Sequence, residues 1–143
     1  MTSEQINLVK ASFAKIEPLA EEAAVLFYAR LFELDPNLRR LFKIDIAKQG
    51  RKLMQMLEIA VNGLDCLDEL VPAVRALGAR HHAYGVEDRD YETVGTALLW
   101  TLEQALGANF TAETKEAWTA VYDLLAETMK DASRLPSENA AVG

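Results

Sequence analysis

The residues best suited to chemistry in this sequence are two adjacent histidines, His81 and His82, and a single cysteine, Cys66. Imidazole and thiolate groups are common ligands of transition metals, and imidazole also exchanges protons near neutral pH. A structural zinc site needs about four such ligands, so these three residues do not support one. One cysteine cannot form a disulfide within the chain, which suits a reducing compartment. We expect Cys66, next to Leu67 and close to Leu64, to be buried, with a reactive thiol as the alternative.

The two histidines point in different directions if their segment is helical, because successive residues of an α-helix are about 100° apart. His81 continues an apolar stripe formed by Leu70, Val74 and Leu77, whereas His82 is expected to meet water. His81 is therefore the candidate metal ligand. The alternative interpretation is a core histidine whose ring bonds to a backbone carbonyl.

The composition is that of an ordinary soluble, folded protein of one domain. The chain has 143 residues, of which 50% are hydrophobic and 26% charged, so it is not expected to be disordered. A net charge of −7 disfavours nucleic acid as a partner. No apolar or basic amphipathic stretch predicts a membrane contact, and residues 1–6 lack the order of a signal peptide. We expect a cytoplasmic protein.

Apolar residues recur with a helical period along most of the chain, and no segment alternates as a strand would. We expect a domain over residues 1–134 and a disordered tail over residues 135–143. The helix starts are predicted at the Thr2/Gln5 capping box, near Pro18, at Gln49, at Asp68 with Pro72 in its first turn, before Tyr91, and at Thr111. The breaks are predicted at Asp35-Pro36, Gly63, Gly85 and Gly107, with a turn over residues 37–42 and a polar corner over residues 43–48.

Several segments, by their order and spacing, resemble the globin family from Ser3 to about Met129. They are residues 26–32, Leu41-Phe42, residues 49–54, residues 79–86, Tyr91 to Gly95, and Ala117-Trp118 with Tyr122. The resemblance is to bacterial single-domain globins of the flavohaemoglobin type, with some neuroglobin-like character in residues 80–86. It implies an all-α globin fold of about six to eight helices around a b-type haem, iron protoporphyrin IX.

The resemblance implies that His81 is the proximal ligand of the haem iron, leaving the sixth coordination position open. Its other ring nitrogen should donate to the carbonyl of Leu77 or meet Tyr91. Lys52 and Arg80 would meet the haem propionates, the alternative for both being a solvated cation.

On the other face, the resemblance implies that Phe42 wedges against the haem edge, that Gln49 opens the distal helix and that Leu53 lies over the iron. Core packing is the alternative for Phe42, and a surface position is the alternative for Gln49. Tyr28 matches a tyrosine that points at bound gas. Bound O2 carries more negative charge than bound CO, so a hydroxyl donor favours O2. A hydrogen bond to such an acceptor is worth about 1.5–3 kcal/mol.

Flavohaemoglobins tie the proximal histidine to a tyrosine and a glutamate. Tyr91 matches the tyrosine, but the glutamate position falls near Ser133, and the nearest carboxylate is Asp131. No Gly-rich nucleotide loop follows Met129. We therefore expect a protein that binds O2, and also NO and CO, for storage, delivery or scavenging. The alternative is a nitric oxide dioxygenase with a separate reductase. A sensor, which would need an output domain, and a haemless helical bundle are less well supported.

Overall fold

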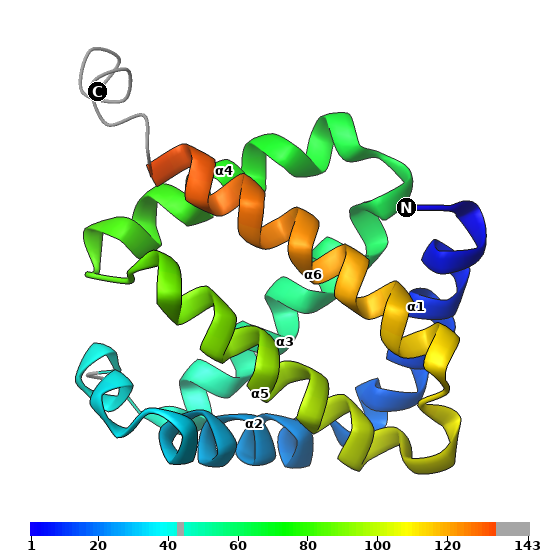
Figure 1. The fold of residues 1–143 in the computed structure, drawn as a ribbon, viewed down its shortest axis with the longest axis horizontal. Coiled ribbons are helices and arrows are strands. Elements are labelled where there is room, and N and C mark those ends of the chain that lie inside the picture. The colour runs from blue at the N-terminus through cyan, green and yellow to red at the C-terminus, as the bar shows by residue number, and fades with distance from the viewer. Residues whose placement is uncertain (43–44, 134–143) are drawn as a thin grey trace.

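The computed structural model describes residues 1–42 and 45–133, and in this part the chain is all-α (Figure 1). The expected tail over residues 135–143 lies outside the described residues. The described α-helices are α1 (Ser3–Ile16), α2 (Ala20–Leu34), α3 (Ile46–Asn62), α4 (Leu67–Ala83), α5 (Asp88–Leu106) and α6 (Ala112–Ser133). Short 3-10 helices connect them: η1 (Glu17–Leu19), η2 (Pro36–Leu41), η3 (Gly63–Asp65) and η4 (Gly107–Asn109). None of the described helices is long and apolar enough to cross a membrane.

The helices pack in two groups that share one core. α6 packs against α1 and α4, whereas α2 packs against α3 and α5. The most deeply buried side chains include Trp118 of α6 and Val9 of α1. The Trp118 ring N–H donates to the hydroxyl of Ser12 at 2.8 Å, so a buried polar group is paired where α1 meets α6.

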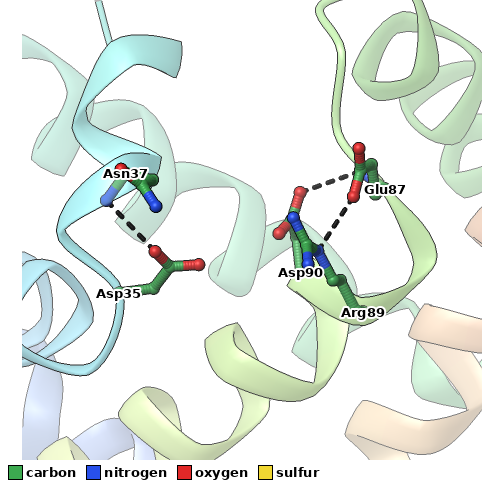
Figure 2. Close-up of polar contacts among 5 residues, drawn as sticks. All are labelled: Asp35, Asn37, Glu87, Arg89 and Asp90. Atoms are coloured by element: carbon green, nitrogen blue, oxygen red, sulfur yellow. Dashed lines mark hydrogen bonds and ion pairs between the residues drawn. The ribbon is translucent and has the colours of Figure 1, made fainter.

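Most helix boundaries follow local signals in the sequence. Thr2 and Gln5 form the expected capping box, and Thr111 accepts from the backbone N–H of Thr114 at 3.2 Å. Figure 2 shows two further caps, at η2 and at the start of α5. Asp35 accepts from the backbone of Asn37 at 3.1 Å. Asp90 accepts from the backbone of Glu87 at 2.8 Å, and Arg89 pairs with Glu87 at 2.9 Å.

Two predicted helix starts were wrong. α3 begins at Ile46 rather than at Gln49, because the Asp45 carboxylate accepts from the backbone of Ala47 at 3.0 Å and caps the helix earlier. α4 begins at Leu67, so that Pro72 lies inside the helix instead of in its first turn. Its first backbone bonds run to the carbonyl of Cys66, which leaves Asp68 within the first turn. The rest of the predicted polar corner, residues 43 and 44, lies outside the described residues.

The expectation that Cys66 is buried was also wrong, because its side chain is exposed. Cys66 does not continue an apolar helical stripe. It is the N-cap residue of α4, in the turn that follows η3, and the neighbouring Leu67 is exposed too. Placement in a turn between two helices explains why apolar neighbours did not bury this thiol.

Gly78 brings α4 and α6 into very close contact. A Cβ atom added at Gly78 would lie 2.5 Å from the Cα atom of Met129, which is closer than carbon atoms approach without bonding. Gly50 plays a similar part between α3 and α2, where an added Cβ would lie 2.9 Å from the Cβ of Ala24. These two glycines fix how near the site-bearing helices α3 and α4 come to their neighbours.

Candidate functional site

His81 lies near the end of α4, and its ring is held by its own helix. The expected bond is present: Nδ1 lies 2.9 Å from the carbonyl oxygen of Leu77. A carbonyl can only accept, so Nδ1 carries a proton and Nε2 of the neutral ring keeps its lone pair. Burial lowers the pKa of His81 below its usual 6.5, although the Leu77 carbonyl raises it in part; nearby Arg80 lowers it further. His81 is therefore a neutral imidazole near pH 7 that can bind a metal ion.

His82 is exposed, whereas His81 is partly buried. The helical rotation inferred from the sequence is thus the one that the structure adopts. A single imidazole cannot bind a metal ion tightly by itself, and the described residues contain no group of three His, Cys, Asp or Glu side chains that could do so. One neutral imidazole is what a protein would have to supply to an iron that is otherwise held by the nitrogens of a porphyrin.

Tyr28, from α2, is buried, with 4% of its surface exposed. Its ring meets Phe27 and Phe42 edge-on, at centroid distances of 5.0 and 5.3 Å. Burial raises the pKa of Tyr28 to about 12, and a hydrogen bond with the Gln49 side chain partly offsets this. The phenol is therefore protonated at neutral pH and can donate a hydrogen bond. The structure thus brings together Tyr28 and Gln49, which are 21 positions apart in the sequence.

Aromatic side chains surround this phenol on the side of η2. Phe42 follows η2 directly and packs against Phe32 of α2, with ring centroids 5.5 Å apart. The guanidinium carbon of Arg39 lies 5.2 Å above the Phe32 ring. Phe42 is only partly buried by the protein, so part of its ring stays available for contact with a flat apolar group.

Leu53 lies one helical turn beyond Gln49 on α3 and is partly buried. It borders a small apolar cavity of about 20 Å³, together with Phe27 from α2 and Leu98 from α5. An apolar cavity of this kind stays dry. Tyr28 does not border this cavity, but Phe27, which does, packs edge-on against its ring.

Tyr91 lies at the start of α5 and does not bond to His81 in this structure; Leu77 holds that ring instead. Burial, and then the charges of Asp88 and Asp90, raise the pKa of Tyr91 to about 12. The hydroxyl of Tyr122 donates to the backbone carbonyl of Tyr91 at 2.5 Å.

Lys130 was not singled out from the sequence. Its ammonium nitrogen lies 5.8 Å from the centre of the Tyr91 ring and 3.6 Å from a carboxylate oxygen of Glu127. Only the packing of α6 against its neighbours reveals this, because 39 residues separate the two positions. Asp131, on the same helix, is exposed.

Lys52 on α3 and Arg80 on α4 are both exposed. Arg80 directly precedes His81, and Lys52 lies three residues after Gln49. Long, exposed cations in these positions suit the carboxylates of a prosthetic group that enters from solvent.

The helices that carry the two sides of the site have different main packing partners. α3 packs against α1 and α2, whereas α4 packs against α6, and within the described residues α3 and α4 share few close backbone approaches. A neutral imidazole on α4, a phenol with an amide on the side of α3, partly exposed apolar side chains and cations at the rim together fit a haem.

A family profile described as Globin matches residues 25–129, which is more than half of the chain. The chain belongs to the globin family. This confirms the resemblance seen in the sequence, and membership of the family implies a haem cofactor and a gaseous ligand for it.

Two curated relatives agree with the two subgroups suggested by the sequence. The globin is 31% identical over 134 residues to the Flavohemoprotein of Vibrio cholerae serotype O1, a match that covers 92% of this chain but only 34% of that relative. The chain thus spans about a third of the length of this relative. The Neuroglobin of Tetraodon nigroviridis is 29% identical over 143 residues, with 90% of each chain covered.

Among solved structures, the globin is similar to a hexacoordinated haem protein from an anhydrobiotic tardigrade. The TM-score is 0.85, and the match covers 94% of this chain and 96% of that chain. The sequences are 18% identical, so this likeness concerns the fold. It confirms the expected globin fold.

Proposed function

We propose that this globin binds O2 reversibly on a b-type haem and serves to store, deliver or scavenge it. The observation that carries the proposal is the buried, protonated Tyr28 beside Gln49. A buried phenol donor favours the diatomic ligand that carries the most negative charge, which is O2 rather than CO. NO and CO are further ligands of the same site.

In this proposal each residue of the pocket has one task. His81 holds the iron through Nε2, and the Leu77 carbonyl fixes the orientation of its ring. Phe42 and Leu53 give apolar contact, while Lys52 and Arg80 meet the propionates. The haem supplies the ferrous iron to which the gas binds. Tyr91 lies on the same side of the proposed haem as His81, and its packing helps to position α5.

Replacing Tyr28 by Phe removes the proposed donor without changing the shape of the ring. We expect O2 release to become about 10- to 100-fold faster, as follows from the loss of a hydrogen bond to a charged acceptor. The rate of O2 association should change less, and CO release should barely respond. Stopped-flow measurement of both gases on the ferrous protein provides the test.

Gln49→Leu serves as the matched comparison, because Gln49 contacts the same phenol. We expect a smaller acceleration of O2 release if Gln49 supports Tyr28. The proposal would be wrong in its distal assignment if Gln49→Leu accelerated O2 release while Tyr28→Phe left it unchanged. It would be wrong altogether if the purified protein bound no haem and showed no Soret band.

Nitric oxide dioxygenase activity with a separate reductase is the second candidate. The match to a Flavohemoprotein over 92% of this chain favours it. The test is nitrate formation from NO under O2, followed over many turnovers with a flavin reductase. Sustained turnover would establish an enzyme, whereas a single turnover per haem would favour O2 binding as the function.

A further inference from the structure

Positive charge is concentrated in one short part of this acidic protein. Residues 39–52 contain six Lys or Arg and one Asp, a net charge of +5, which leaves −12 for the rest of the chain. We name five of these side chains the basic rim, all of them exposed: Arg39, Arg40, Lys48, Arg51 and Lys52.

The basic rim lies next to the gas-binding pocket. Lys48, Arg51 and Lys52 are spaced i, i+3 and i+4, so they share one exposed stripe in the first two turns of α3. Gln49, whose side chain meets Tyr28, follows directly after Lys48. On η2, Arg39 stacks over Phe32, which in turn packs against Phe42. η2 and the start of α3 lie at the same end of the molecule as the corner between α4 and α5, on the left of Figure 1.

The part of the chain that the structure describes does not neutralise the charge of the basic rim. None of its five cations is ion-paired to a carboxylate within residues 1–42 and 45–133; the pairs found there involve other cations. The single carboxylate of the segment, Asp45, is engaged as the cap of α3. Two haem propionates would offset two positive charges at most, so an excess remains for another partner.

The opposite side of the pocket is acidic. Around the corner between α4 and α5, residues 80–92 hold four carboxylates against two arginines, Arg80 and Arg89, a net charge of −2 with the histidines neutral. A negatively charged partner is therefore attracted to the side of η2 and α3 and repelled from the side of α5. Among the described residues of this segment, 39–42 and 45–52, there is also no exposed large hydrophobic residue, as insertion into a membrane surface would require.

From this charge distribution we propose that the basic rim docks an acidic electron-transfer protein, which re-reduces the haem of this globin. The inference rests on the proposed function, since a ferrous gas carrier stops working once its iron is oxidised. The donor loses one electron and the ferric iron gains it, without any bond being formed or broken. Electron transfer weakens steeply with distance, so docking beside the pocket, rather than elsewhere on the surface, makes the transfer fast.

The test compares reduction of the ferric holoprotein by two donors in a stopped-flow instrument. The first is a reduced plant-type ferredoxin, an acidic one-electron protein donor, and the second is reduced lumiflavin, a small uncharged donor. The variant Arg40→Glu/Lys48→Glu/Arg51→Glu reverses three charges of the basic rim and leaves Lys52, a proposed propionate partner, in place. At low salt we expect it to slow reduction by ferredoxin about tenfold or more and to leave reduction by lumiflavin unchanged.

The control variant is Lys15→Glu/Lys115→Glu, which reverses two exposed charges, one at the end of α1 and one near the start of α6. These two segments lie on the right of Figure 1, away from η2. Both donors should reduce the ferric form of this variant at the wild-type rate. The wild-type rate with ferredoxin should fall as salt rises toward about 0.5 M, because added ions screen the attraction. In an independent binding measurement, oxidised ferredoxin added to the CO-bound holoprotein should perturb backbone amide NMR signals between residues 39 and 52.

The proposal would be overturned if ferredoxin reduced the triple variant as fast as the control variant. It would also be overturned if ferredoxin perturbed backbone amides away from residues 39–52. Loss of the Soret band in the triple variant would assign these cations to haem retention and overturn it too. If the triple variant kept its rate with ferredoxin but no longer bound vesicles of phosphatidylserine, the basic rim would be a membrane contact instead. A failure of the ferrous protein to bind O2 would be seen separately, and it would refute the proposed function without altering these rates.

Discussion

Two neighbouring histidines in this globin have different surroundings, and their substitution separates two interpretations of α4. His81 is partly buried and bonded to Leu77, whereas His82 is exposed. We expect His81→Ala to abolish stable haem retention, because it removes the proposed iron ligand. His82→Ala should leave the Soret spectrum of the purified protein unchanged. The reverse result would show that the proximal ligand has been misassigned.

The raised pKa of Tyr28 makes a prediction about stability at alkaline pH. The phenol ionises at about 12 in the folded protein and near 10.0 when exposed. Below pH 10 both states are protonated, so the stabilisation is fully present. Above pH 10 the unfolded chain loses its proton first, and the stabilisation is lost as the pH rises toward 12. Between pH 9 and pH 11 we expect the free energy of unfolding to fall by about 1 kcal/mol more in the wild type than in Tyr28→Phe.

Urea unfolding of the haem-free protein at the two pH values measures this difference. Tyr91 has a raised pKa as well, so both proteins should become less stable at pH 11, and only the difference between them reports on Tyr28. Parallel losses in the two proteins would mean that the hydroxyl of Tyr28 is not buried in solution.

The sequence predicted some site residues better than others, for a physical reason. Helical rotation alone separated His81 from His82, and the bond to Leu77 follows from a spacing of one turn. The pairing of Tyr28 with Gln49 needed the family resemblance, because it joins two helices. The approach of Lys130 to Tyr91 was not predicted at all. Long-range pairs of this kind depend on how helices cross, which periodicity within one helix does not specify.

Helix starts and ends show the same division between local and distant causes. The Thr2 capping box and the end of α5 at Gly107, whose φ is +56°, follow from local chemistry and were predicted. Asp45 is also a local signal, and it could have placed the start of α3 correctly. The start of α4 at Leu67 has no such signal in the sequence, because its N-cap residue, Cys66, makes no side-chain hydrogen bond to the helix.

The close helix crossings at Gly50 and Gly78 lead to a prediction with an internal control. At an exposed position inside a helix, replacing Gly by Ala stabilises the folded protein by about 1 kcal/mol. At Gly78 the new methyl group would meet the backbone of Met129 at 2.5 Å. We therefore expect Gly78→Ala to destabilise the protein by about 1–3 kcal/mol in urea unfolding, and to weaken haem binding because His81 lies three residues away.

Gly50→Ala meets only a methyl group, the Cβ of Ala24 at 2.9 Å. The double change Ala24→Gly/Gly50→Ala should therefore recover most of the stability lost in Gly50→Ala. Met129→Ala should not rescue Gly78→Ala, because the obstruction there is backbone. Rescue by Met129→Ala would show that α4 and α6 are not as close in solution as in this structure.

Across the whole molecule, packing and charge divide the globin into two parts. α1 and α6 pack against each other and carry the almost fully buried Val9 and Trp118, whereas Leu53 on α3 and Leu77 on α4 stay partly exposed. The net charge was readable from the sequence, but the confinement of the basic rim to one side of the pocket required the fold. The all-α class needed only the helical period, since no strand pattern competed with it.

This division predicts which parts of the protein become less protected from hydrogen exchange when the haem is removed. Leu53 and Leu77, which we propose to face the haem, are only partly covered by protein, so in this proposal the cofactor supplies much of their burial. Amide hydrogen exchange should therefore slow on haem binding far more in the first half of α3 and the last turns of α4 than around Val9 and Val121, which are covered by protein alone. We expect the holo-to-apo ratio of protection to differ by about tenfold or more between the two regions. The same ratio at every slowly exchanging amide would mean that haem acts only on global unfolding, and that α3 and α4 are as well packed without it as the rest of the molecule.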